Sequence, residues 1–264
     1  MRRIAFLLAT TLWCWGSYAQ DSKNALEYKV KMPNSKDRKI TIELGDGSIK
    51  IEGYDGDEVQ FRASSGYEAP PERAKGLKPI YNSAVDNSGI GLAVTQESGG
   101  LKIEKATRKS IDYTIRVPRK VAILYQQVNW MGSTINISNM DGDLEVRTNN
   151  ANINLNRVSG PVVANTTSGE IQVVFANLNQ EKPSALTTIA SAIDVTLPAN
   201  AKTNLHLRTI NGEMYTDFDL GLKSSKDGLS KVGGGHNIEG TTNGGGVDIQ
   251  LKTISSNIYV RKQK

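Results

Sequence analysis

Apolar and polar residues alternate in short stretches along most of this chain, and in its middle part the stretches recur at a constant interval. Five corner segments of turn-forming residues begin nine residues apart, at Trp130, Asn139, Thr148, Arg157 and Thr166. Each corner is followed by two apolar residues with one residue between them. These pairs are Ile135 and Ile137, Leu144 and Val146, Ile153 and Leu155, Val162 and Ala164, and Ile171 and Val173. Alternation with a period of two is typical of strands that bury one face.

The nine-residue unit is long enough for one short strand and one corner, but too short for a βαβ unit or a hairpin with its own core. Stacking solves this problem, because each strand then pairs with the equivalent strand of the next coil and the inward aliphatic side chains form ladders. The pattern therefore predicts an all-β parallel β-solenoid with two units, about 18 residues, in each coil. An antiparallel meander would explain the alternation but not the constant unit.

Further copies of the corner continue the pattern toward the end of the chain. They begin at Thr188, Thr209 and Thr253, and residues 243–247 form a looser copy. Extra residues separate these copies, and the longest insertion, 221–235, is rich in lysine, serine and glycine. That composition is typical of a flexible surface loop.

The residues before the regular repeat also contain alternating stretches, at 40–44, 49–52 and 59–63. A solenoid end exposes apolar side chains and open strand edges, so we expect this part to form an N-terminal β cap. Residues 64–89 make a long excursion with at most one helical turn near 72–75. Loops of this length are uncommon unless they are functional or disordered.

The domain organisation follows from these patterns. We predict a cleaved signal peptide at residues 1–19 and a single β-solenoid domain at residues 20–264. Within the domain, residues 20–120 form the N-terminal cap and irregular coils, and residues 121–264 form regular coils with a loop at 221–235.

The first nineteen residues have the three parts of a secretory signal peptide. Arg2 and Arg3 precede an apolar run at residues 4–15, and Ser17 and Ala19 place small residues before a cleavage site. The run is too short to span a membrane, which takes about 20 apolar residues, and no other segment qualifies. We therefore expect an exported protein that is periplasmic, outer-membrane-associated or extracellular.

Loss of the signal peptide limits the chemistry of the mature chain. Cys14 is the single cysteine among the 264 residues, so its removal excludes disulfides, thiolate nucleophiles and cysteine-bound zinc. A lipid anchor on Cys14 is disfavoured, because Leu12 and Trp13 stand where a lipoprotein signal has small residues. Removal of Arg2 and Arg3 lowers the net charge from +5 to +3. That mild charge indicates no nucleic-acid partner.

Three corners share a turn-forming residue, a glycine, one variable residue and an apolar residue: Ser168-Gly169-Glu170-Ile171, Asp141-Gly142-Asp143-Leu144 and Asn211-Gly212-Glu213-Met214. With the signal peptide and the strand-Gly-Asp-Gly-strand opening, they resemble the bacterial "putative adhesin" domains of unknown function. The likeness covers residues 40–264, and residues 72–87 resemble the long loop of Bacteroidetes-type members. It implies a right-handed parallel β-helix in an exported protein. It implies no enzymatic activity and offers no catalytic residues to carry over.

Catalysis is the first alternative, since many parallel β-helices cleave polysaccharides with clustered carboxylates. The carboxylates that stacking could bring together are Asp141, Asp143, Glu145, Glu170, Asp194 and Glu213. Asp141 and Asp143 flank a glycine, which is ordinary turn chemistry. Most outward positions of the regular strands are Asn or Gln, which do not titrate. We therefore predict no catalytic residues.

Metal binding is the second alternative. Calcium-binding β-rolls carry a Gly-Gly-x-Gly-x-Asp corner, and none of the five aligned corners has it. Asp55-Gly56-Asp57 supplies two carboxylates, too few for a calcium cage. His206 is expected to point outward from a strand and His236 to lie in a loop, neither at ligand or triad spacing. We predict no metal ion and no cofactor.

Eight asparagines lie between Asn129 and Asn156. They can stack from coil to coil and share amide hydrogen bonds, or they can hydrogen-bond sugar hydroxyls. Aromatic residues border this region, and an exposed ring there can stack on a sugar. The basic stretch 102–120 and the long loop offer cationic contacts. The candidate ligand contacts are Trp130, Tyr125, Arg73, Lys75, Arg116 and Arg119.

The sequence favours a non-catalytic, adhesin-like binding or structural protein of the cell envelope or surface, with glycans or proteins as partners. The alternative is an envelope polysaccharide-modifying enzyme, a lyase or hydrolase on the same scaffold. Three or more outward carboxylate, lysine or arginine side chains in a groove would favour the enzyme. A flat face of Asn and Thr with exposed aromatics would favour the binder. The oligomeric state is left open.

Overall fold

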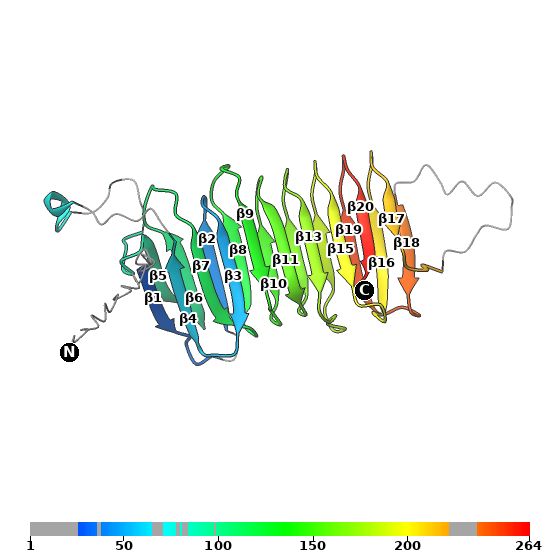
Figure 1. Cartoon of the computed structure of the whole chain (residues 1–264), viewed down its shortest axis with the longest axis horizontal. Helices are drawn as coiled ribbons and strands as arrows, with labels where there is room; N and C mark the ends of the chain where they lie inside the picture. The colour runs from blue at the N-terminus through cyan, green and yellow to red at the C-terminus, as the bar shows by residue number, and fades with distance from the viewer. Residues whose placement is uncertain are drawn as a thin grey trace, which may run out of the picture.

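The computed structural model describes residues 26–35, 38–64, 71–77, 80, 84–97, 99–221 and 237–264. Within them the chain forms twenty strands and one short 3-10 helix, η1 (Glu72–Ala74). The strands make two ten-stranded sheets that extend along the whole molecule (Figure 1). The prediction of an all-β protein is confirmed. No helix among these residues is long and apolar enough to cross a membrane.

Sheet A contains ten strands. In spatial order these are β1 (Leu26–Lys31), β4 (Glu58–Ala63), β7 (Tyr113–Pro118), β3 (Ile49–Tyr54), β9 (Thr134–Ser138), β11 (Asn152–Val158), β13 (Ile171–Phe175), β15 (Ile193–Leu197), β20 (Ile258–Lys262) and β17 (Met214–Thr216).

Sheet B contains the other ten strands. In spatial order these are β18 (Asn237–Thr242), β16 (Thr203–Arg208), β19 (Val247–Lys252), β14 (Ser184–Thr187), β12 (Val162–Asn165), β10 (Leu144–Arg147), β8 (Ala122–Gln127), β2 (Lys39–Leu44), β6 (Gly100–Lys105) and β5 (Leu92–Glu97).

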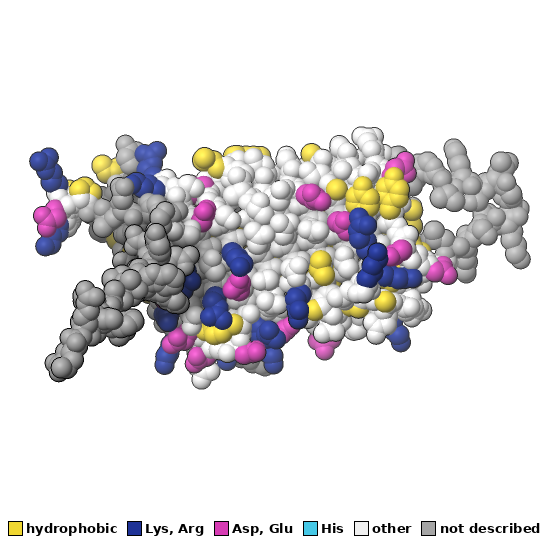
Figure 2. Space-filling view, viewed as in Figure 1, with side chains coloured by type: hydrophobic (Ala, Val, Ile, Leu, Met, Phe, Trp, Pro, Cys, Tyr) yellow, Lys and Arg dark blue, Asp and Glu magenta, His cyan; other side chains and the backbone are white. Residues whose placement is uncertain are grey.

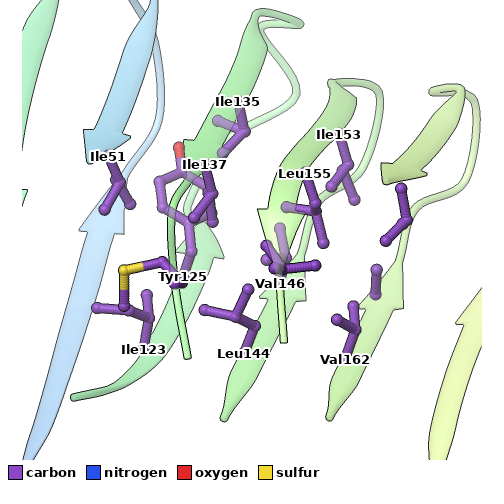
Figure 3. Close-up of a cluster of buried hydrophobic side chains, with 14 of the residues drawn as sticks. Ile51, Ile123, Tyr125, Ile135, Ile137, Leu144, Val146, Ile153, Leu155 and Val162 are labelled. Atoms are coloured by element: carbon purple, nitrogen blue, oxygen red, sulfur yellow. The ribbon is translucent and has the colours of Figure 1, made fainter. Parts of the chain in front are cut away.

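The regular strands bury every second side chain, as the alternation predicts. In β9 the pattern places Ile135 and Ile137 inward and Asn136 outward. Ile153 pairs with Ile135 on one side and with Ile171 on the other, so residues aligned by the sequence repeat lie side by side. The inward side chains of the two sheets meet in one continuous hydrophobic cluster (Figure 3). Burial of each aliphatic side chain is worth about 1.5–3 kcal/mol.

The coils stack in an order that differs from their order in the chain. The chain alternates between the sheets from β6 to β17, and most strand pairs are parallel. The coil formed by β2 and β3, however, lies between the β6–β7 coil and the β8–β9 coil. In the same way the β19–β20 coil lies between the β14–β15 coil and the β16–β17 coil. The first and last parts of the solenoid are therefore inserted inside the stack.

The expected N-terminal cap is thus only partly correct. The stretches 40–44 and 49–52 form β2 and β3, which are internal strands, because their alternating aliphatic residues fit between two other coils. The cap consists instead of β1, β4 and β5, which pair antiparallel at this end of the sheets. At the other end β18 pairs antiparallel with β16. Antiparallel strands end the parallel stack and limit its open edges.

The corners explain why each repeat unit needs small residues. A methyl group on Gly169 would overlap the carbonyl oxygen of Ala151, and one on Gly160 would overlap that of Gly142. Neighbouring corners are also joined by backbone bonds, such as Thr167 N–H to Asn149 O at 2.9 Å. Glycine is required at Gly169 and Gly160 because the next corner lies directly against the backbone.

A ladder of buried threonines supports one row of corners. Thr188 donates its hydroxyl to the carbonyl of Gly169 at 3.0 Å, and Thr209 donates to Ser256 at 2.9 Å. Thr253 makes the equivalent bond to the next corner at 3.0 Å. These hydroxyls satisfy corner carbonyls that no strand can reach.

The two predicted loops are only partly described. The single helical turn expected near residues 72–75 is present as η1. The predicted signal peptide lies outside the described residues, as do His236 and nearly all of the loop at 221–235.

Candidate functional site

The outward face of sheet A carries one continuous row of side chains, one from each strand. Register places each of them beside the next, and none of them is buried. Neighbouring strands are about 4.8 Å apart, so the ten positions form a straight line across the face. This sheet A row consists, in spatial order, of Glu27, Arg62, Thr114, Lys50, Asn136, Asn154, Gln172, Asp194, Tyr259 and Tyr215.

The middle of the sheet A row is made of amides. Asn154 donates its Nδ2 to the Oδ1 of Asn136 at 3.1 Å, and Gln172 is the next residue along the row. This bond confirms the predicted stacking of asparagines from coil to coil. An amide has two donors and two acceptor lone pairs, so each of these side chains keeps capacity for an external partner. Figure 2 shows a broad region on this face where neither charged nor hydrophobic side chains gather.

Two stacked tyrosines form the C-terminal end of the sheet A row. The ring centroids of Tyr259 and Tyr215 are 5.3 Å apart and their planes differ by 10°. Tyr215 is 52% exposed and stands on β17, the last strand of sheet A. Hydrophobic side chains are visible beside charged ones at this end of the face (Figure 2). Among the described residues, no further strand of sheet A lies beside the face of Tyr215 that points away from Tyr259.

Polar contacts hold Tyr259 in place. Arg261 binds Asp194 through three bonds between 2.9 and 3.0 Å, and its guanidinium lies 5.2 Å from the Tyr259 ring centroid. The hydrogen bonds that Arg261 donates to the Asp194 carboxylate raise the pKa of Arg261. Asn257 donates its Nδ2 to the Tyr259 hydroxyl at 2.9 Å. A ring fixed in this way offers stacking area with little loss of side-chain entropy.

A cavity of about 1010 Å³ lies among the corners that lead from sheet A to sheet B, around the corner between β7 and β8. Arg119 points between two carboxylates there, with its Nε 3.3 Å from Asp55 and 3.8 Å from Asp141. Asp143, also in the lining, accepts a 2.6 Å bond from Lys182, which raises the pKa of that lysine. This is the charged groove that the enzyme alternative requires.

The carboxylates of the cavity are poorly suited to proton transfer. Asp55 is 84% exposed, and Asp141 and Asp143 are also open to solvent. A general acid needs burial or a neighbouring carboxylate to keep its proton at neutral pH. Here each carboxylate is open to solvent and lies beside a cation, Arg119 or Lys182.

The structure overturns one predicted contact. Tyr125 is 1% exposed and its ring lies among inward aliphatic side chains (Figure 3), so it cannot meet a ligand. Its position in β8 is inward, and its hydroxyl donates to the carbonyl of Leu44 at 3.3 Å. Burial, helped by the charge of Asp46, raises the pKa of this hydroxyl.

The other predicted contacts reach solvent at least in part, but they are scattered. Trp130 is 68% exposed in the corner between β8 and β9. Arg116 lies on the outward face of sheet A, 4.7 Å from the Tyr54 ring centroid, far along the sheet from β17. Arg73 and Lys75 are in and next to η1. With Arg119 in the cavity, these residues occupy several regions rather than one site.

Sequence reasoning missed the tyrosine pair, although a signal was present. Aligning the corners that begin at Thr209 and Thr253 places Tyr215 and Tyr259 at the same position, directly after the inward Met214 and Ile258. Equivalent outward positions lie side by side when their coils are neighbours, and two rings there are close enough to stack.

Within the described ranges, no three His, Cys, Asp or Glu side chains are placed to hold a metal ion. His206 points outward from β16, with its ring nitrogens 3.9 Å from Glu239 and 3.8 Å from Asp248.

Comparisons with known proteins identify a family. The family model described as Toastrack DUF4097 matches residues 13–261. No curated protein shows a significant match.

Three solved structures resemble the chain at low sequence identity. A "putative cell adhesion protein" from Clostridium sporogenes is 12% identical with a TM-score of 0.48, over 90% of this chain and 100% of that one. A "putative adhesin" from Bacteroides fragilis is 9% identical with a TM-score of 0.29, over 92% and 98%. A "putative lipid binding protein" from Parabacteroides distasonis is 12% identical with a TM-score of 0.24, over 92% and 98%.

Proposed function

This chain belongs to the Toastrack DUF4097 family, which confirms the resemblance carried by its corner motifs, and on that premise we propose that it is an exported, non-catalytic binding protein of the cell envelope or surface. Its ligand is an extended glycan that lies along the sheet A row.

The observation that carries this proposal is the order of side chains along the sheet A row. The aligned amides are followed by Asp194 and then by the stacked Tyr259–Tyr215 pair. Sugar hydroxyls both donate and accept hydrogen bonds, and amides offer both in return. The C–H face of a sugar ring is apolar and packs on an aromatic face. Five strand spacings separate Asn136 from Tyr215, about 24 Å, so the row suits a polymer better than a small molecule.

The absence of catalysis is part of the proposal. The cavity around Arg119 holds three carboxylates, and an envelope polysaccharide-modifying enzyme is the alternative that this observation favours. Exposure of those carboxylates and the cations beside them support binding over proton transfer.

The finer features of the fold and of export belong to the same proposal. We take residues 1–19 as a cleaved signal peptide and residues 20–264 as one domain, which the single continuous core supports. We take the solenoid as right-handed with about 18 residues per regular coil. Crossovers between parallel strands of one sheet are right-handed in nearly all proteins, and the regular strands pair at the repeat interval.

The test uses the chain from Gln20 in affinity electrophoresis through gels that contain neutral or anionic polysaccharides. New reducing or unsaturated chain ends are measured in the same samples. Tyr215→Ala is expected to weaken retention roughly 3- to 10-fold, because it removes one stacking surface. Trp130→Ala is the matched control, since it removes an exposed aromatic residue from a different edge and should leave retention unchanged.

The outcomes separate the alternatives. Equal retention of wild type and Tyr215→Ala would refute the sheet A row as the binding face. Loss of retention in Trp130→Ala would move the site to that corner. New chain ends that disappear in Asp141→Asn would replace the binder with an enzyme at the cavity.

A further inference from the structure

A second row of side chains lies beside the sheet A row on the same outward face. It stands two residues further along each strand, so the two rows are about 6.7 Å apart. From β9 to β20 the second row consists of Ser138, Asn156, Val174, Thr196 and Arg261. None of these side chains is buried. From β9 to β17 the sheet A row and the second row together form a strip, which we call the polar strip.

The amides of the polar strip are available to a ligand. Asn156 and Gln172 are exposed, and neither side chain makes a hydrogen bond to another residue of the described part of the chain. Asn154 uses one of its two donors on Asn136 and keeps the other. Each amide therefore presents a donor and an acceptor, and a sugar hydroxyl can use both at once.

The spacing of the polar strip fits one kind of glycan. Neighbouring strands are about 4.8 Å apart, which is close to the advance of one sugar in a fully extended β-linked chain. Such a chain is a flat ribbon that carries its hydroxyls along both edges. Laid across the strands, it brings one sugar over each strand and one edge toward each row. An α-linked chain of the same sugars curves and leaves this straight line.

The charges within the polar strip neutralise each other. Asp194 and Arg261 are the charged residues of its two rows, and three bonds of 2.9 to 3.0 Å join them. Only 18% of the Asp194 side chain is exposed, so this carboxylate has little surface left for a ligand. The strip crosses the part of the face where charged side chains are few (Figure 2).

The residues that border the polar strip add no excess of positive charge. Glu170 and Glu213 come directly before β13 and β17, and Asp217 follows β17. Arg157 and Lys262 lie at the far ends of β11 and β20. Three acidic residues against two basic ones offer no net attraction to an acidic polysaccharide. The face is therefore suited to an uncharged chain.

We infer that the ligand of the polar strip is a neutral, β-linked glycan ribbon that runs across the six strands from β9 to β17, with one sugar over each strand. This inference rests on the proposed function, because it names the class of glycan that the sheet A row holds. Amides of both rows exchange hydrogen bonds with the hydroxyls along the ribbon edges, and the Tyr259–Tyr215 pair meets the last sugars.

A length series tests the fit of sugars to strands. Calorimetric titration of the chain from Gln20 with cello-oligosaccharides of two to six glucose units gives a Kd for each length. We expect Kd to fall with every added sugar, because each one reaches a further strand. Maltohexaose contains six glucose units in α-linkage, and it should bind at least about tenfold more weakly than cellohexaose, since most of its sugars cannot meet the strip.

A charged analogue tests neutrality. Cellohexaose oxidised to its hexauronate keeps the linkage and adds one carboxylate to each sugar. It should bind more weakly than cellohexaose in low salt, and the difference should narrow in high salt, which screens the acidic residues beside the strip. The Kd of cellohexaose itself should not change with salt, because uncharged contacts are not screened.

A matched pair of variants places the ribbon on sheet A. Asn154→Asp keeps the shape of the side chain but removes its donors, and it should weaken cellohexaose binding roughly 3- to 10-fold, the effect of about one hydrogen bond. Asn165→Asp makes the same change at an exposed outward position of sheet B and should leave the Kd unchanged.

The outcomes separate this inference from the proposed function. Tighter binding of the hexauronate than of cellohexaose, weakened by Asn154→Asp, would refute the neutral class and leave the sheet A row as the glycan site. Equal binding of maltohexaose and cellohexaose would refute the fit of one sugar to each strand. Cellohexaose binding that neither Asn154→Asp nor Tyr215→Ala weakens would overturn the inference and the proposed site together. No binding of any cello-oligosaccharide would overturn the inference alone, because retention in the polysaccharide gels decides the proposed function separately.

Discussion

The corner glycines are the positions where the stacking of coils can be tested most directly. Gly169 does not have a positive φ, so its backbone conformation is open to any residue. A methyl group there would overlap the carbonyl oxygen of Ala151 and lie 2.5 Å from its carbon. Both atoms belong to the backbone, so no change of rotamer can relieve the contact. Gly169→Ala therefore forces two neighbouring corners apart.

The size of the effect follows from that geometry. Carbon atoms pack at about 3.5–4.0 Å, so the corners must separate by about 1 Å. Overpacking of this kind costs about 1–3 kcal/mol, and weakening the bond from Thr188 to the Gly169 carbonyl adds about 1 kcal/mol. Where a backbone tolerates alanine, the same substitution stabilises by about 0.4–1 kcal/mol. The sign of the change is therefore informative, and we expect a net destabilisation of about 2–3 kcal/mol.

Urea unfolding of the chain from Gln20, followed by Trp130 fluorescence and circular dichroism, measures the effect as a lower midpoint at unchanged slope. Ser256→Ala is the control, because Ser256 occupies the same corner position in another coil and already carries a Cβ. The free energy of unfolding of Ser256→Ala should stay within about 0.5 kcal/mol of the wild-type value. An equal or higher midpoint for Gly169→Ala would refute the close packing of the corners.

Two further substitutions test the polar contacts of the stack. Thr188→Val should lower the free energy of unfolding by about 1–3 kcal/mol in urea titrations, because the Gly169 carbonyl loses its buried donor, whereas Thr187→Val on the outward side should change little. Glu27→Gln should lower the urea midpoint slightly at neutral pH. The hydrogen bond from Arg62 holds the pKa of Glu27 below its ordinary value of 4.5, so the stabilisation is full above pH 4.5 and is lost as pH falls through the lowered pKa. A midpoint difference that grows on acidification would contradict that sign.

The sequence was sufficient to predict strands, corners and stacking, because all three leave periodic marks. Alternation follows from burial of one face of a strand, and the nine-residue interval follows from one strand and one corner. Even the shared amide bond between Asn136 and Asn154 could be anticipated, because residues at the repeat interval become neighbours in the sheet.

Alternation does not show which side chains of a strand face the core where apolar residues are consecutive. Ile123, Leu124 and Tyr125 follow one another, so alternation alone does not decide which of them point inward. The structure places Ile123 and Tyr125 in the core. The outward tyrosines escaped notice for a different reason, since each lies in a separate copy of the repeat and only stacking of β20 beside β17 brings Tyr259 to Tyr215.

The order of the coils could not be predicted, and the reason bears on how the protein folds. Every coil presents aliphatic ladders of the same spacing, so a nine-residue unit does not specify its neighbour. Insertion of the β2–β3 coil and of the β19–β20 coil joins segments far apart in the chain. In a simple solenoid each repeat contacts only its sequence neighbours and ends can fray one coil at a time. Here an inner coil at each end cannot leave without separating the coils on both sides of it. The interleaved order should therefore make folding slower and unfolding more cooperative than in a sequential stack.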